Sequence, residues 1–134
     1  MKKFAWVLSM VLWGVAAASD QESPLTVGGA VTITTEKAKE LFDQGVPFVD
    51  VRTDKDWDAG RIPGAEHLEL KSSFSQAALG AFAGPTDPVV FYCNGSKCLR
   101  SAEAAEQAVS WGYGQVYYYR DGFPAWQAAG YPIE

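Results

Sequence analysis

One stretch, residues 89–101, constrains the fold more than any other part of this 134-residue chain. It begins with four strand-forming residues, Val89 to Tyr92, which run directly into Cys93. Small and polar residues follow, and an Arg-Ser pair then opens the alanine- and glutamate-rich segment 102–109. We predict a buried strand, a tight loop and a helix in this order. Because the loop amides and the positive end of the helix would converge on one point, they would favour a thiolate at Cys93 and an anion beside it.

The N-terminal segment predicts a cleavable export signal over residues 1–18. A basic start precedes a short apolar run and then small residues. This run is well short of the roughly 20 residues that a membrane-spanning helix needs. We therefore expect a periplasmic or secreted protein with no stable membrane association after the signal is removed. Residues 19–30 predict a flexible N-terminal lead, and residues 31–134 predict a single folded domain.

The net charge argues against two classes of partner. Removal of the signal takes away two lysines and changes the formal net charge from −5 to −7. Nucleic acids and anionic lipids are attracted by basic patches, so we expect neither as a partner. Any anion site must be made locally, by main-chain amides and one or two cations.

Strand-like and helix-like segments alternate through the rest of the chain, which predicts a parallel α/β sheet covered on both faces. The strand predictions are residues 31–33, 47–51, 66–70, 89–92 and 116–119. The helix predictions are one between Thr34 and Gly45, one turn within 54–60, and residues 72–82, 101–111 and 123–129. In such folds ligands bind at the carboxyl ends of strands, and Cys93 directly follows one of these ends.

Four segments together resemble a single-domain rhodanese, a member of the thiosulfate and persulfide sulfurtransferase family. They are Phe48–Arg52, Trp57–Ala65 with Arg61 in place of the usual His, Val89–Ser101, and Tyr119–Pro132 with Asp121 in place of the first Gly of the usual pair. Their order and spacing carry the resemblance over residues 31–134. It implies a rhodanese-like α/β fold with a five-stranded, mainly parallel sheet and helices on both faces. It also implies that Cys93, after the fourth strand, is the catalytic nucleophile.

The resemblance further assigns the substrate- and anion-binding loop. Its residues are Asn94, Gly95, Ser96, Lys97, Cys98 and Leu99, followed by the cation Arg100 and by Ser101, which opens the helix. The usual family loop is shorter than the six residues that separate Cys93 from Arg100 here. The chain is therefore expected to be an exported rhodanese with an atypically long catalytic loop.

The implied activity is sulfur transfer from thiosulfate or a persulfide or polysulfide donor. The sulfane sulfur would pass through a Cys93 persulfide to a thiol or cyanide-type acceptor, in a monomer without metal or organic cofactor. Two alternatives stay open. One is a periplasmic thiol-redox, sulfur-sensing or sulfur-carrier module that uses Cys93 and Cys98. The other is phosphatase-like anion chemistry on the same loop, for which the visible motifs lack a good general acid.

Individual site residues keep their structural alternatives. Cys93 could also be a packed strand-end cysteine. Arg100 would orient a leaving sulfite through its fork of donors, or be a solvated helix-start arginine. Lys97 could be a second cation or a solvated lysine. Cys98 could resolve the Cys93 persulfide or sulfenate by forming a disulfide, carry a second sulfur, or fill the loop. A disulfide in so small a ring would stabilise the fold little.

Overall fold

The computed structural model describes residues 21–134, so the export signal predicted over residues 1–18 lies outside the described residues. The chain forms one five-stranded sheet in the order β1-β5-β4-β2-β3, and every neighbouring pair is parallel. The strands are β1 (Ala30–Thr32), β2 (Phe48–Asp50), β3 (Glu66–His67), β4 (Val89–Tyr92) and β5 (Val116–Tyr119). The predicted α/β fold class is confirmed.

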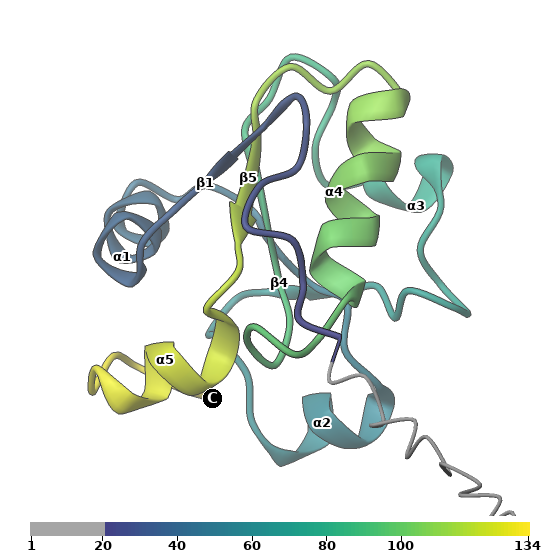
Figure 1. Ribbon diagram of the computed structural model, residues 1–134. Coiled ribbons are helices and arrows are strands. Elements are labelled where there is room, and N and C mark those ends of the chain that lie inside the picture. The colour runs from purple at the N-terminus through teal and green to yellow at the C-terminus, as the bar shows by residue number, and fades with distance from the viewer. Residues whose placement is uncertain (1–20) are drawn as a thin grey trace, which may run out of the picture.

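Within residues 21–134, five helices follow the strands in turn. They are α1 (Thr35–Asp43), α2 (Asp54–Ala59), α3 (Gln76–Gly80), α4 (Arg100–Ser110) and α5 (Gly122–Ala128). In Figure 1, α1 and α5 lie on one side of the sheet, and α3 and α4 lie on the other. The sheet is thus covered on both faces, as predicted. No helix within residues 21–134 has the length and apolar content needed to cross a bilayer.

The central strand, β4, shows how the two faces are filled. Val89, Phe91 and Cys93 belong to the apolar cluster that includes α4, whereas Val90 and Tyr92 belong to the cluster that includes α1 and α5. Successive side chains of a strand point to opposite faces, which explains this alternation. All four residues of β4 are fully buried. A continuous apolar strand is what a parallel sheet covered on both faces requires.

Helix α3 is shorter than the predicted helix over residues 72–82. The carbonyl oxygen of Glu69 accepts hydrogen bonds from the main-chain amides of residues 72–74. This stretch therefore turns around Glu69 instead of entering a helix. Ser75 then caps α3, because its hydroxyl accepts a hydrogen bond from the main-chain amide of Ala78 at 3.0 Å.

The N-terminal segment 21–29 packs against the domain, which differs from the flexible lead that its composition predicts. Val27 and Ser23 are 5% and 3% exposed. The main-chain amide and the hydroxyl of Ser23 both donate hydrogen bonds to the carbonyl oxygen of Ser96, at 2.7 and 2.8 Å. The Ser23 carbonyl oxygen in turn accepts from the Arg120 guanidinium at 3.1 and 3.3 Å. Tertiary contacts therefore fix a segment whose local sequence is typical of a linker.

Candidate active site

Cys93 begins a loop at the carboxyl end of β4, the middle strand of the sheet. Its side chain is 1% exposed and lies in the apolar cluster shared with Phe91 and α4. Its carbonyl oxygen accepts a hydrogen bond from the main-chain amide of Phe123 at 2.9 Å. The predicted nucleophile therefore lies where parallel α/β sheets usually bind their ligands.

Cys93 forms a disulfide with Cys98. A turn in the loop brings the two residues together. Gly95 has a φ of 106°, and its carbonyl oxygen accepts a hydrogen bond from the Cys98 amide at 3.0 Å. The Cα atoms of the two cysteines lie 6.2 Å apart, which is an ordinary spacing for a disulfide. The structure shows the bond that a resolving role of Cys98 would require, and in this state Cys93 has no thiolate.

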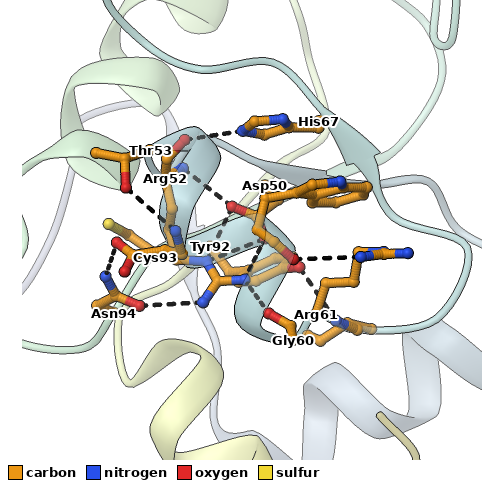
Figure 2. Close-up of polar contacts among 12 residues, drawn as sticks. Asp50, Arg52, Thr53, Gly60, Arg61, His67, Tyr92, Cys93 and Asn94 are labelled. Carbon is orange, nitrogen blue, oxygen red and sulfur yellow. Dashed lines mark hydrogen bonds and ion pairs between the residues drawn. The ribbon is translucent and has the colours of Figure 1, made fainter. Parts of the chain in front are cut away.

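Next to the loop, a buried ion pair fixes the first loop residue (Figure 2). Asp50 is fully buried and accepts hydrogen bonds from Nε and Nη2 of Arg52 at 3.0 and 2.7 Å. Nη2 of Arg52 also donates to the carbonyl oxygen of Gly60 at 2.6 Å, and Nη1 donates to Oδ1 of Asn94 at 3.2 Å. Nδ2 of Asn94 then donates to Oδ2 of Asp56 at 2.8 Å. The Asn94 side chain is therefore held by Arg52, which follows β2, and by Asp56 of α2.

The hydroxyl of Tyr92, the register partner of Asp50, extends this network on the same face of the sheet (Figure 2). It accepts a hydrogen bond from the main-chain amide of Ile62 at 3.2 Å. Burial raises the pKa of Tyr92, and the nearby Asp50 carboxylate raises it further. The hydroxyl thus stays neutral and holds the segment after α2 against the sheet.

Arg100, the predicted cation at the end of the loop, points to Glu69. Its Nη1 donates hydrogen bonds to Oε1 of Glu69 and to the carbonyl oxygen of Val51. A hydrogen bond from the Ser72 hydroxyl and the pairing with Arg100 lower the pKa of Glu69 to about 2. The charge of Arg100 is therefore balanced within the domain by Glu69.

An open cavity of about 550 Å³ lies between the loop and the start of α5. Its lining residues are Asn94, Gly95, Ser96, Lys97, Asp121, Pro124 and Ala125. The first half of the predicted anion-binding loop therefore faces this cavity, and the exposed Lys97 brings a cation to it. Neither cysteine lines the cavity, so in the disulfide state the predicted nucleophile is separated from it.

The helix start after the loop carries one polar group without a partner. Leu99 occupies the cap position of α4 and makes no side-chain hydrogen bond to it. The hydroxyl of Ser101 is the only buried side-chain nitrogen or oxygen within residues 21–134 that lacks a hydrogen bond. The first turn of α4 thus has unused hydrogen-bonding capacity in the disulfide state.

His67, the sole histidine, contacts the main chain and an aromatic ring. Its Nε2 lies 2.9 Å from the carbonyl oxygen of Arg52, and its ring stacks on Trp57 with centroids 4.7 Å apart. These contacts give His67 a structural role, and neither of them pairs its ring with a nucleophile. Across residues 21–134, no group of three or more His, Cys, Asp or Glu side chains is placed to hold a metal ion.

Three supporting residues are not among those predicted from the sequence. Ser23 binds the loop at Ser96, Glu69 pairs with Arg100, and the Phe123 amide holds Cys93. Each contact joins residues that are distant in the sequence, and no local pattern indicates it. Only the start of α5 offered a signal, because it lies in one of the four segments that carry the family resemblance.

Comparison with known proteins gives one family and several relatives. Residues 34–129 match the family model described as Rhodanese-like domain. The chain is 33% identical over 105 residues to the thiosulfate sulfurtransferase GlpE of Pseudomonas fluorescens, which covers 76% of this chain and 88% of that protein. It is also 33% identical over 89 residues, or 66% of its length, to an HTH-type transcriptional regulator of Mycobacterium tuberculosis. The chain spans only 38% of that regulator.

Solved structures show the same fold. A protein of unknown function from Rhodopseudomonas palustris, described as a possible tyrosine phosphatase, is 36% identical to this chain with a TM-score of 0.63. The similarity covers 78% of this chain and 85% of that one.

Proposed function

This chain belongs to the rhodanese-like domain family, and we propose that it is a sulfurtransferase whose nucleophile is Cys93. The family and the GlpE relative support sulfur transfer as the class of reaction. The observation that carries the assignment to Cys93 is its place at the end of the central strand, directly before a loop and the N-terminus of α4. We propose thiosulfate or a persulfide or polysulfide as the donor.

The proposed first step forms a persulfide on Cys93. The Cys93 thiolate attacks the outer sulfur of thiosulfate, a new S–S bond forms, and sulfite leaves with the electron pair of the donor's broken S–S bond. Loop amides and the positive end of α4 favour the thiolate and the persulfide. In the second step, a thiol or cyanide-type acceptor attacks the outer sulfur and restores the Cys93 thiolate.

The disulfide state must open before this chemistry can begin. Because Cys93 is bonded to Cys98 and is 1% exposed, no donor sulfur can be attacked. Opening the disulfide frees the Cys93 thiolate, which a donor then has to reach from the neighbouring cavity lined by Asn94 to Lys97. Lys97 lines that cavity and would attract an anionic donor. Arg100 contributes only if its pairing with Glu69 is broken.

The test compares thiocyanate formation from thiosulfate and cyanide by the purified protein after reduction and removal of the reductant. With cyanide in large excess, so that it captures the persulfide, we expect thiocyanate from the wild type and none from Cys93→Ser. Cys98→Ser is the matched control, since it removes the other loop thiol and should form thiocyanate without prior reduction. Thiocyanate formation by Cys93→Ser at the wild-type rate would show that Cys93 is not the nucleophile.

The similarity to the Rhodopseudomonas palustris protein favours one competing activity, the hydrolysis of a phosphate ester at the same loop. Such a reaction needs a cation for the phosphate, and here Arg100 is paired with Glu69. An assay of p-nitrophenyl phosphate hydrolysis by the reduced protein distinguishes the two activities. If the wild type releases nitrophenol and Cys93→Ser does not, phosphate-ester hydrolysis would be the better-supported activity.

We further propose that the protein acts as a monomer in the periplasm or outside the cell. The basic start, short apolar run and small residues of segment 1–18 support export. The mass of the protein recovered from the periplasm tests export, because removal of the signal leaves a chain that begins near residue 19, and the elution volume of the same protein in size-exclusion chromatography tests the monomeric state. A recovered chain that retains residue 1 would contradict it.

A further inference from the structure

The two loop cysteines occupy unequal positions. Cys93 is 1% exposed and packs beneath α4, whereas Cys98 is only partly buried and lies at the edge of the same cluster. The sulfur of Cys93 is therefore shielded, and Cys98 is the more accessible partner. Thiol–disulfide exchange begins at a sulfur that an attacking thiolate can reach. We therefore expect an external thiolate to attack the sulfur of Cys98 and not that of Cys93.

The loop that joins the cysteines is held at several points. The Cys93 carbonyl oxygen is bound by the Phe123 amide, and the Ser96 carbonyl oxygen is bound twice by Ser23. Within the loop, the Cys98 amide is bound to the Gly95 carbonyl oxygen. Because these contacts fix the main chain from Cys93 to Cys98, they hold the two sulfurs near each other and raise their effective concentration.

We propose that Cys98 resolves the Cys93 persulfide, so that the protein releases the sulfane sulfur as hydrosulfide. The inference rests on the proposed function, because that function supplies the persulfide. The Cys98 thiolate attacks Sγ of Cys93, and the bond between the two Sγ atoms forms. The bond between Cys93 Sγ and the outer sulfur breaks, and the outer sulfur leaves as hydrosulfide with the electron pair and the persulfide proton.

The products of this step include the disulfide that the structure shows. The two cysteine sulfurs are oxidised from the thiol level to the disulfide, and the sulfane sulfur is reduced to the sulfide level. No oxidant other than the persulfide itself is needed. The reaction consumes the stored sulfur inside the protein, and an acceptor thiol is then unnecessary for sulfur release.

A dithiol co-reactant completes the cycle and supplies the two electrons. Its first thiolate attacks the accessible Sγ of Cys98, and Cys93 leaves as a thiolate at the positive end of α4, which makes it the better leaving group. The second thiol of the co-reactant attacks the mixed disulfide and frees Cys98 as a thiol. The partner class is therefore a dithiol reductant that contacts the loop at Cys98.

A single-turnover experiment tests the release step. The reduced protein, freed of reductant and kept anaerobic, receives one equivalent of thiosulfate, and sulfite, hydrosulfide and the protein mass are measured. For the wild type we expect one equivalent each of sulfite and hydrosulfide and a protein that has lost two hydrogens. For Cys98→Ser and Cys98→Ala we expect sulfite, a stable protein with one added sulfur atom, and no hydrosulfide.

Two results would overturn the inference in distinguishable ways. A wild-type protein that keeps the added sulfur beside a free Cys98 contradicts the resolving role and leaves the proposed sulfurtransferase function standing. Absence of the added sulfur and of sulfite in the wild type and both variants contradicts the proposed function itself. The two Cys98 variants must agree, since serine and alanine differ in polarity but equally lack the thiol.

The direction of reduction has its own test. The oxidised wild type is treated with a monothiol, the free cysteine is alkylated, and the modified peptides are mapped by mass spectrometry. We expect the monothiol on Cys98 and the alkyl group on Cys93. The opposite arrangement would show that the buried sulfur is attacked first and would overturn the proposed contact at Cys98.

Discussion

The main-chain amide of Phe123 donates a hydrogen bond to the carbonyl oxygen of Cys93 at 2.9 Å. This bond ties the first turn of α5 to the residue that begins the loop. The two segments approach so closely that only glycine fits before Phe123. A Cβ atom at Gly122 would overlap the Cys93 carbonyl oxygen and would lie 2.8 Å from the Gly95 nitrogen.

Replacement of Gly122 by alanine should therefore damage both stability and the site. Gly122 has a φ of 65°, which costs an alanine about 1 kcal/mol, and the overlap with Cys93 adds about 2 kcal/mol more. The matched control is Gly130→Ala, since Gly130 has a φ of 77° but open space where its Cβ would lie. Urea unfolding should show a clearly larger loss for Gly122→Ala, with slower thiocyanate formation. Equal losses would contradict the close approach.

The ion pair between Asp50 and Arg52 should be costly to break. Both residues are nearly inaccessible, at 0% and 2% exposed, so Asp50→Asn leaves a buried guanidinium without its counter-charge. We expect a loss of about 3 kcal/mol in the free energy of unfolding. Asp43→Asn makes the same change in net charge at an exposed pair with Lys39, and it should cost less than about 0.5 kcal/mol. Similar losses for the two variants would argue against the buried pair.

Replacement of two buried serines by alanine should change the free energy of unfolding in opposite directions. The Ser23 hydroxyl bonds to the Ser96 carbonyl oxygen, so Ser23→Ala should lower the free energy of unfolding by about 1 kcal/mol. The Ser101 hydroxyl has no hydrogen bond within the described residues, so Ser101→Ala should raise the stability of the disulfide form by up to about 1 kcal/mol. Denaturant melts of both variants with the disulfide intact check the signs. A loss at Ser101 as large as that at Ser23 would mean that its hydroxyl is bonded.

Glu69 should make stability depend on acidity. Hydrogen bonding from Ser72 and pairing with Arg100 lower the pKa of Glu69 to about 2 in the folded protein, against an ordinary value of about 4.3. The resulting stability is fully present above the ordinary pKa and is lost as the pH falls from about 5 to about 2. Glu69→Gln should therefore lose less stability over this interval than the wild type.

Unfolding free energies measured in this pH interval test the prediction for Glu69. Glu106→Gln serves as the control, since it removes an exposed carboxylate of α4. Its stability should fall with pH in parallel with the wild type. If the Glu69→Gln curve also runs parallel to the wild type, the pairing of Glu69 with Arg100 does not hold in solution.

Most of the fold follows from local patterns in the sequence. The apolar runs 89–92 and 116–119 form β4 and β5 at the predicted residues. Thr34 caps α1 as its position suggests, and its hydroxyl accepts a hydrogen bond from the Lys37 amide at 3.1 Å. These features depend on neighbouring residues alone, so composition and spacing are sufficient to predict them.

The predicted strand 66–70 marks where local patterns cease to be sufficient. β3 ends at His67, because the amides of Leu68 and Leu70 bond to the carbonyl oxygens of consecutive residues of β2 and its extension, Asp50 and Val51. The segment after β3 thus advances by two residues while the segment after β2 advances by one, and the regular ladder of hydrogen bonds ends. Alternating hydrophobicity does not determine this register.

In the candidate site too, local sequence predicts some features and tertiary contacts decide the others. The strand, loop and helix pattern places Cys93 correctly at the end of β4. The direction of Arg100 depends on Glu69, and the pairing of Cys98 depends on the turn at Gly95. Both are decided by contacts that become available only once the chain has folded.

The alternation of side chains along β4 limits how a chain of this kind can diverge. Cys93 faces α4 because it lies two residues beyond Phe91, which belongs to the same apolar cluster. Deletion of one residue within the strand would turn the sulfur toward α1 and α5. Insertions after Cys93 leave its orientation unchanged. During evolution the length of the loop can therefore change without turning the nucleophile to the other face of the sheet, so such proteins can acquire new reactants through insertions that follow this one residue.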